Sequence, residues 1–270
     1  MEGVTEGTRS GTLAAPVSAP LLTANDLREA LAAIRVSAPV HAEGEIASTN
    51  TFALELADAG TPEWTLVSAA HQTVGRGRHG RSWIDVPGRA LMVSVVLRPT
   101  IRPPRAGLLS LLAGASLAQA IRDETGRAAS CKWPNDVRVD GAKVAGVLVE
   151  SRVVDERLAA LVIGVGLNLE APRGVADAAG VGDAALRSLL ITFLRHLHAG
   201  YSVPDGDLSE RVRATWLPLS DTIGREVDAT ATTGETVHGR AVGIDAFGGL
   251  LVSTDSGERV VGFGDVATLT

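Results

Sequence analysis

Three glycines and three arginines lie within seven residues of this chain, in the segment 75–83, which reads GRGRHGRSW. Glycine lets a backbone turn tightly and approach a ligand closely, because it has no side chain to obstruct either. Arginine supplies a permanent positive charge and a forked set of donors that match a carboxylate or a phosphate. Because like charges repel, this arginine loop is predicted to close over an anionic ligand.

A second polar cluster, KWPND, occupies residues 132–136, and Lys143 and Gly146 follow it after a short gap. Proline, asparagine and aspartate favour a turn, so the ordinary interpretation is a turn with Trp133 in the core. An Asn-Asp pair at the end of a strand could also hold a metal-bound triphosphate. Lys143, just beyond a hairpin, is either a solvated lysine or a charge placed where an oxyanion develops.

Smaller polar groups lie near the ends of other predicted elements. Ser48, Thr49 and Asn50 form a helix N-cap cluster, and their hydroxyls and amide could also bind the polar head of a ligand. Gln72, just before the arginine loop, is either a strand-end residue or a ligand donor. Segment 164–168, GVGLN, ends a strand with two glycines, which indicates close backbone packing, and its asparagine could contact a nucleotide.

Several other chemistries are disfavoured by the sequence. The spacing of the loop glycines satisfies the fingerprint of dinucleotide-binding proteins, but Pro87-Gly88 prevents the helix that this fingerprint requires. The six histidines show no metal-binding spacing. No Ser-His-Asp or Cys-His arrangement is legible, and Cys131 is expected to be a small buried residue.

The composition bounds the class of protein. A chain of 270 residues with a net charge of −6 forms one large domain or two smaller ones and is unsuited to bulk nucleic-acid binding. A single cysteine permits no intrachain disulfide, which fits a reducing cytoplasm. No apolar run reaches the ~18 residues that a membrane span needs. Residues 1–20 lack the features of a secretory signal and are predicted to be a disordered leader.

Hydrophobic periodicity predicts an α+β fold, in which a mixed sheet is backed by helices. The first helix begins at Thr23, with Asp26 completing a capping box. Short alternating runs beyond Leu219 predict a small antiparallel barrel, so the expected boundaries are 21–218 and 219–270. The other expected helices cover 48–59, 105–124, 185–197 and 208–216, and the expected strands cover 64–70, 90–97, 131–133, 137–139, 144–149 and 158–169.

Taken in order, these motifs resemble those of the biotin protein ligases. The resemblance rests on Ser48-Thr49-Asn50, Gln72, GRGRHGRSW, KWPND, Lys143 to Glu150, GVGLN, and Gly224-Arg225-x-Val227. It covers residues 21–270 and implies a class II synthetase-like catalytic domain over 21–218 with an SH3-like β-barrel over 219–270. The chain resembles the short type, because an N-terminal DNA-binding domain would need about 60 residues before the catalytic region.

The resemblance implies a two-step reaction with biotin and ATP as substrates and Mg²⁺ on the triphosphate. The carboxylate of biotin attacks the α-phosphate, pyrophosphate leaves, and biotinyl-5′-AMP stays bound. A lysine of a biotin carboxyl carrier protein domain, in an acetyl-CoA, acyl-CoA or pyruvate carboxylase, then attacks the mixed anhydride and releases AMP. The expected protein is a cytoplasmic monomer or weak homodimer that binds neither DNA nor membrane and is not a transcriptional repressor.

Residues that match the family motifs receive expected roles from this resemblance. Lys143 would lie beside the biotin carboxylate and the α-phosphate, Arg78 would close over the intermediate, and Asp136 would orient the acceptor lysine or take its proton. The expected biotin contacts are Ser48, Thr49, Asn50, Gln72, Gly75, Arg76, Gly77, Arg78, Lys143 and Gly146. The expected ATP contacts are Arg81, Trp83, Asn135, Asp136, Lys143, Asn168 and Arg225, and no metal ligands are assigned.

Two other interpretations stay open. A lipoate ligase or octanoyl transferase shares a related fold, but it uses a cysteine nucleophile or a lysine in a different setting and is not expected to carry the 75–83 and 132–136 motifs. A biotin-binding module without turnover is the second, and the intact Lys143, Arg78 and Asp136 argue against it.

Overall fold

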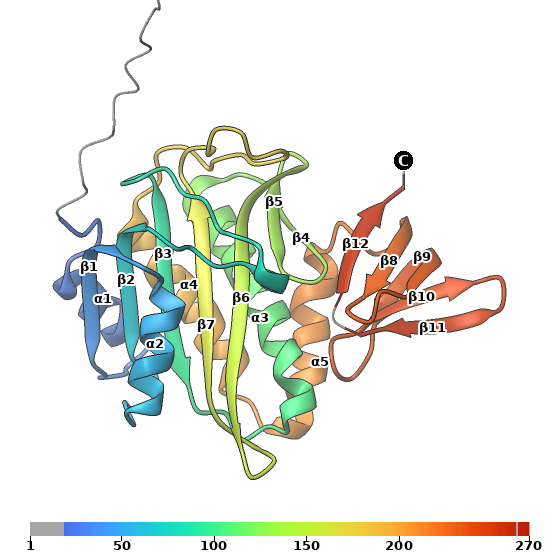
Figure 1. The fold of residues 1–270 in the computed structure, drawn as a ribbon, viewed down its shortest axis with the longest axis horizontal. Coiled ribbons are helices and arrows are strands. Elements are labelled where there is room, and N and C mark those ends of the chain that lie inside the picture. Colours follow the sequence, from blue (N-terminus) through green and yellow to red (C-terminus); the bar gives the residue numbers. More distant parts are fainter. Residues whose placement is uncertain (1–18, 263, 270) are drawn as a thin grey trace, which may run out of the picture.

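The centre of the molecule is a seven-stranded mixed sheet with the strand order β1-β2-β3-β7-β6-β5-β4 (Figure 1). The computed structural model describes residues 19–262 and 264–269, so the predicted leader lies outside the described residues except for its last two. β1 and β2 pair in parallel, and the other neighbours in this sheet pair antiparallel. The predicted mixed sheet is confirmed.

The strands follow the predicted order, with one addition. The sequence did not predict β1, because VHAEGEI lacks the clean apolar alternation of a half-buried strand. β6 is longer than predicted, since it continues into a projecting hairpin with β7 (Figure 1). The bounds are β1 Val40–Ile46, β2 Leu66–Gln72, β3 Ala90–Leu97, β4 Ala129–Lys132, β5 Asp136–Val139, β6 Ala142–Val154 and β7 Arg157–Asn168.

Helices cover both faces of this sheet, but unequally. Four helices pack against one face in the main apolar core, and α2 packs alone on the other face with a smaller cluster. The strand alternation produces this division: Leu66 belongs to the main core, and the next residue, Val67, packs with α2. The helices are α1 Ala24–Ala32, α2 Thr49–Asp58, α3 Ala106–Thr125, α4 Leu186–Tyr201 and α5 Asp205–Trp216.

Local signals set the helix ends as predicted. Thr23 caps α1, and its backbone N–H donates to Asp26 at 2.8 Å while its side chain accepts from the Asp26 N–H at 3.2 Å. α3 ends at Gly126, whose φ of 70° is a left-handed conformation that glycine adopts without strain. None of the helices in the described part of the chain has the length and apolar content needed to cross a bilayer.

A separate five-stranded antiparallel sheet follows α5, with the order β11-β10-β9-β8-β12. The predicted small antiparallel β domain is confirmed, but β11 and β12 are the two edges of the sheet, so the described strands do not pair into a closed barrel. Trp133 joins it to the main unit, because its indole N–H donates to the Gly248 carbonyl at 3.0 Å and its backbone N–H to the Thr222 hydroxyl at 3.0 Å. The bounds are β8 Glu226–Ala231, β9 Thr236–Ile244, β10 Leu250–Thr254, β11 Gly257–Val261 and β12 Gly264–Thr268.

The contact between α3 and α4 depends on a small residue. A Cβ added at Gly200 of α4 would lie 2.4 Å from the Leu112 Cδ1 atom, whereas a Cβ at Gly114 of α3 would meet nothing within 4 Å. We expect Gly200→Ala to lower the free energy of unfolding by about 1–3 kcal/mol through overpacking. Gly114→Ala, the matched control, should raise it by up to about 1 kcal/mol. Urea denaturation measures both, and a Gly200→Ala protein as stable as the parent would contradict this packing.

Candidate functional site

A cavity of about 400 Å³ lies between the α2 side of the main sheet, the arginine loop and the C-terminal sheet. It collects residues that are far apart in the sequence. The structure places in its lining the predicted residues Ser48, Thr49, Asn50, Gln72, Arg76, Gly77, Arg78, Arg81, Trp83, Asn135, Asp136, Lys143 and Gly146.

The floor of the cavity is made of glycines from two neighbouring strands. Gly146 of β6 pairs directly with Gly166 of β7, and Gly164 lies two residues earlier in β7. A Cβ at Gly166 would lie 2.5 Å from the Trp83 ring, and one at Gly164 would lie 2.0 Å from the Asn50 Oδ1 atom. The missing side chains therefore make room for Trp83 and Asn50 against the sheet.

Polar side chains at the α2 end of the cavity form a buried network. Ser48 is the N-cap of α2, so Thr49 and Asn50 occupy its first turn, and all three are almost fully buried. The Thr49 backbone N–H donates to Gln72 Oε1 at 2.7 Å, and the Thr49 hydroxyl lies 3.1 Å from the same oxygen. Ser94 of β3 lies 2.9 Å from the Thr49 hydroxyl and donates to Asn50 Oδ1 at 2.7 Å.

The arginine loop folds as a hairpin with a tight tip. The backbones of Arg76 and Ser82 form an antiparallel β-bridge, and the Trp83 N–H donates to the Gly75 carbonyl at 3.0 Å. A Cβ at Gly75 would lie 2.3 Å from the Trp83 carbonyl oxygen, so this close pairing needs glycine. A short 3₁₀ turn from Arg78 to Gly80 forms the tip, which rules out the helix of a dinucleotide-binding fold at this point.

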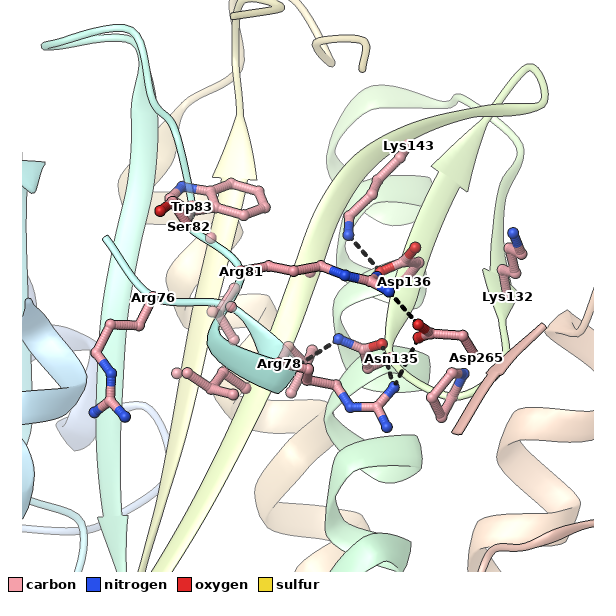
Figure 2. A pocket seen from close by; sticks show the side chains of 18 of the residues that line it. Arg76, Arg78, Arg81, Ser82, Trp83, Lys132, Asn135, Asp136, Lys143 and Asp265 are labelled. Atoms are coloured by element: carbon pink, nitrogen blue, oxygen red, sulfur yellow. Dashed lines mark hydrogen bonds and ion pairs between the residues drawn. The ribbon is translucent and has the colours of Figure 1, made fainter. Parts of the chain in front are cut away.

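Two arginines of the loop reach the C-terminal sheet. Figure 2 shows Arg78 and Arg81 directed toward Asp265 of β12, which forms an ion pair with Arg81 and lies 3.8 Å from Arg78. Arg78 also donates to the Gly264 carbonyl at 2.9 Å and to Asn135 Oδ1 at 3.2 Å. Burial lowers the pKa of Arg78, although Asp265 and Asp136 oppose this effect. Arginine is protonated throughout the physiological range, so the Arg78 guanidinium stays charged at neutral pH.

The KWPND segment and Lys143 meet through a tight hairpin. Asp140 and Gly141, with φ values of 52° and 79°, connect β5 to β6 in the two-residue turn that the sequence predicts. This register returns Lys143 toward the start of β5, where its Nζ lies 2.5 Å from Asp136 Oδ1 (Figure 2). The neighbouring Asn135 is fixed by its Nδ2 atom, which donates to the Val147 carbonyl at 2.8 Å.

Some expected contacts lie elsewhere. Gly75, Asn168 and Arg225 are not among the described residues that line the cavity. Gly75 shapes the loop, and Asn168 is buried and donates to the Ala179 carbonyl at 3.3 Å. Arg225 is exposed at the entrance to the C-terminal sheet, on a part of that sheet that does not border the cavity.

Three residues with a place in this geometry were not predicted from the sequence. Ser94 interrupts an apolar strand at a buried position, which is a signal that sequence analysis could have used. Glu150 binds Arg76, with 2.8 Å between the Arg76 Nη2 and Glu150 Oε1 atoms. Asp265 lies 184 residues from Arg81 in the chain and carries no local signal of its role.

The structure also bears on the alternative chemistries. Cys131 is buried in the main core, and burial raises the pKa of its thiol, so it is unsuited to act as a thiolate nucleophile. Within residues 19–262 and 264–269, no group of three or more His, Cys, Asp or Glu side chains is arranged to hold a metal ion.

The packing of Trp83 on Gly166 can be tested without any ligand. We expect Gly166→Ala to push the indole off the sheet, because the added methyl would lie 2.5 Å from the ring. Trp64, Trp133 and Trp216 are buried, so the rise in acrylamide quenching of tryptophan fluorescence should come from Trp83. A Trp83→Phe protein identifies that signal. Unchanged quenching in Gly166→Ala would show that the indole does not lie on this glycine.

The comparisons with known proteins agree with this geometry. Residues 45–168 match the biotin/lipoate A/B protein ligase family, and residues 222–268 match the biotin protein ligase C-terminal domain. The bifunctional ligase/repressor BirA of Bacillus subtilis is 30% identical over 82% of this chain and 71% of its own length. The biotin–[acetyl-CoA-carboxylase] ligase of Mycobacterium tuberculosis is 34% identical over 82% of this chain and 86% of its own length.

Solved structures give the same result. The biotin protein ligase from Aquifex aeolicus, in complex with biotin and ATP, superimposes with a TM-score of 0.65 at 26% identity, over 85% of this chain and 97% of that chain. Family match, identity and fold lead to one conclusion: the chain belongs to the biotin protein ligases of the biotin/lipoate A/B protein ligase family.

Proposed function

We propose that this chain activates biotin with ATP as biotinyl-5′-AMP and then transfers biotin to a lysine of a biotin carboxyl carrier protein domain. One observation carries the proposal. A buried polar network around Thr49 and Gln72 lines the same cavity as the cations Lys143, Arg78 and Arg81, and glycines form the floor. A ligand with a polar head and a carboxylate tail can therefore present that carboxylate to the cations.

The network at the α2 end has a free hydrogen-bond acceptor and a free donor that match the N–H and C=O groups of the ureido head of biotin. Ser94 has one proton and gives it to Asn50 Oδ1, because that oxygen cannot donate. The Thr49 hydroxyl donates its one proton to Gln72 Oε1, lies 2.9 Å from the Ser94 hydroxyl, and keeps a lone pair for a ligand N–H. Gln72, whose oxygen is occupied, offers its NH₂ group to a ligand carbonyl. A cyclic urea carries both partners side by side.

The same two groups disfavour lipoate and octanoate. A dithiolane or alkyl head has neither an N–H donor nor a carbonyl, so it would leave the Gln72 NH₂ group and a Thr49 lone pair without ligand partners. Each unsatisfied polar group costs about 1–3 kcal/mol. A site built for hydrogen bonds discriminates strongly against ligands that lack them, and we therefore assign biotin as the acid.

Lys143 is placed to promote the first step. A biotin carboxylate oxygen bonds to the α-phosphorus of ATP as the bond to the pyrophosphate oxygen breaks, and negative charge concentrates on the phosphoryl oxygens. The Lys143 ammonium is held by Asp136 at 2.5 Å and so is oriented before substrates arrive. A positive charge fixed in this way stabilises the transition state more than a mobile one.

We assign the nucleotide to the side of the cavity that contains Trp83, Asn135 and Arg81. Arg78 and Arg81 lie on the loop that covers this side, and they match the anionic phosphates. With the loop closed, water is kept from the mixed anhydride, which it would otherwise hydrolyse. Asn168 and Arg225 are left out of this assignment, because they do not border the cavity.

The acidic residues of the cavity could bind Mg²⁺ only together with the phosphates of the nucleotide. Asp136 is the carboxylate nearest Lys143 and is partly exposed in the cavity. Mg²⁺ commonly keeps several waters and binds through one or two carboxylates plus substrate phosphates, so Asp136 would suffice as a protein ligand. When bound, the ion would neutralise charge on the triphosphate.

In the second step the neutral acceptor lysine amine attacks the carbonyl carbon of the anhydride, the bond to the phosphate oxygen breaks, AMP leaves, and the nitrogen loses one proton as the amide forms. We propose that Asp136, which lies in the cavity beside Lys143, orients the acceptor lysine or takes this proton. The acceptor is proposed to belong to an acetyl-CoA, acyl-CoA or pyruvate carboxylase. For the chain itself, the proposed units are a catalytic domain at 21–218 and a C-terminal domain at 219–270, in a cytoplasmic monomer or weak homodimer.

Biotin-dependent exchange of labelled pyrophosphate into ATP tests the first step. We expect exchange with biotin and none with lipoate or octanoate. Lys143→Ala should lower the rate by about 10²–10³-fold, because it removes the preorganised charge. Arg138→Ala is the matched control, since Arg138 lies opposite Lys143 in the β5–β6 pairing but does not line the cavity. Undiminished exchange in Lys143→Ala, or exchange with lipoate instead of biotin, would refute the proposal.

Loop closure is tested by release of the intermediate. We expect Arg78→Ala to retain pyrophosphate exchange but to release biotinyl-5′-AMP about tenfold faster or more, the effect of losing one charged hydrogen bond. Released intermediate labels lysines of an added bystander protein. This chain interferes little, because Lys132 and Lys143 are the two lysines in its sequence. Arg225→Ala is the control and should release no more than the parent; equal retention by Arg78→Ala would exclude the assigned role.

A further inference from the structure

Glu150 joins the arginine loop to the buried polar network, and nothing above assigns it a role in the reaction. Its Oε1 atom lies 2.8 Å from Arg76 Nη2, and its Oε2 atom accepts from Arg76 Nη1 at 3.2 Å and from Asn50 Nδ2 at 3.0 Å. We infer that Glu150 is a positioning residue, which holds Arg76 and Asn50 together and so sets the donor directions at the biotin end of the cavity. This inference rests on the proposed function for its ligand, but not for its geometry.

The carboxylate determines which way the Asn50 amide faces. Glu150 is only an acceptor when ionised, and the Leu148 carbonyl, 3.3 Å from Asn50 Nδ2, is also only an acceptor. Both require the Asn50 NH₂ group on their side, so its Oδ1 atom must face Ser94. Ser94 then donates to Asn50 Oδ1 at 2.7 Å, and the Thr49 hydroxyl at 2.9 Å competes for the same proton. The negative charge on Glu150 therefore favours the bond from Ser94 to Asn50 and leaves more of the Thr49 acceptor capacity for a ligand N–H.

The same carboxylate controls one side of the loop. Figure 2 shows the Arg76 guanidinium directed away from Arg78, Arg81 and Asp265. Arg76 is anchored to β6 of the main sheet through Glu150, while Arg78 and Arg81 are anchored to the C-terminal sheet. Ordering of the loop and ordering of the biotin-binding network are thus coupled through one side chain.

Glu150→Gln removes the negative charge of the side chain and keeps its size and shape. A glutamine has one oxygen for the donors of both Arg76 and Asn50, so its NH₂ group must face one of them. If Asn50 flips to relieve this clash, it loses its bond to the Leu148 carbonyl, and Ser94 donates to Thr49 alone and occupies one of the two lone pairs that a ligand N–H can use. We expect the KM for biotin to rise about tenfold, the equivalent of one charged hydrogen bond, while kcat changes less than about twofold.

A second readout needs no substrate. Trypsin can bind Arg76 only after that side chain leaves Glu150, so Glu150→Gln should speed cleavage after Arg76 in the ligand-free protein by about fivefold. Asp58→Asn is the matched control, because the Asp58–Arg152 pair, at 2.9 Å, joins the same helix and strand away from the cavity. It should alter neither cleavage nor the KM for biotin.

Exchanging the carboxylate and the amide between positions 50 and 150 tests whether the pairing of donor with acceptor sets the KM for biotin. In the double variant Asn50→Asp with Glu150→Gln, Ser94 and the introduced glutamine amide donate to the introduced carboxylate, and Arg76 donates to the glutamine oxygen. The Leu148 carbonyl loses its Asn50 donor in Asn50→Asp and in the double variant alike. We expect the KM for biotin to return to within about threefold of the parent, although each single change raises it. Additive losses in the double variant, or parental KM and cleavage in Glu150→Gln, would overturn the inference. Altered cleavage in a protein without biotin-dependent exchange would reject the proposed function and leave the coupling of Glu150 to the loop intact.

Discussion

Positive charges gathered for an anionic substrate repel one another before that substrate arrives, and the structure is organised around this constraint. Each cation has a carboxylate partner: Asp136 pairs with Lys143, Glu150 with Arg76, and Asp265 with Arg81. Asp265 also lies near Arg78. The carboxylates come from different elements of the fold: β5, β6 and the C-terminal β12. The cations are therefore distributed around the cavity and not clustered at one point, and each is directed before a ligand binds. This explains why the small C-terminal sheet must be packed against the main one, which it achieves through Trp133.

The glycine floor imposes a second constraint, which the main sheet satisfies. A central strand pair normally places side chains on both faces, but Gly146, Gly164 and Gly166 leave the α2 side of β6 and β7 bare. The opposite side of β7 carries Ile163, Val165 and Leu167 in the main core, so the strand stays anchored by apolar burial. The sheet is thus stabilised mainly from one side, and the other side is free to hold a ligand, Trp83 and the polar network.

Much of the framework was predictable, because its signals are local. Helix caps, the Asp140-Gly141 turn and apolar periodicity depend on neighbouring residues, and they located α1, α3 and the β5–β6 hairpin. The polar strand β1 was missed, since only tertiary pairing with β2 makes it a strand. The acidic partners were missed for the same reason: Glu150 lies 74 residues from Arg76, and Asp265 lies 184 from Arg81. Arg225 illustrates the converse, since its motif matches but the residue is exposed and is not among the described residues that line the cavity.

The strength of these ion pairs explains how the loop can be ordered and still admit substrates. Arg81 is 67% exposed and Asp265 42% exposed at the side chain, so solvent screens their interaction. Such exposed pairs contribute about 0.2–1 kcal/mol each, too little to hold the loop shut against an incoming ligand. A triphosphate offers more charge and several acceptors in a drier setting, where charged hydrogen bonds contribute about 1.5–3 kcal/mol. Under the proposed function, the nucleotide can therefore displace Asp265 from Arg81, whereas Glu150, which is more buried and serves two donors, stays in place. Arg76 would then be a fixed point of the loop, as would Arg78, which is 16% exposed and also donates to the Gly264 carbonyl. Arg81 would be the side chain that exchanges a carboxylate for a phosphate.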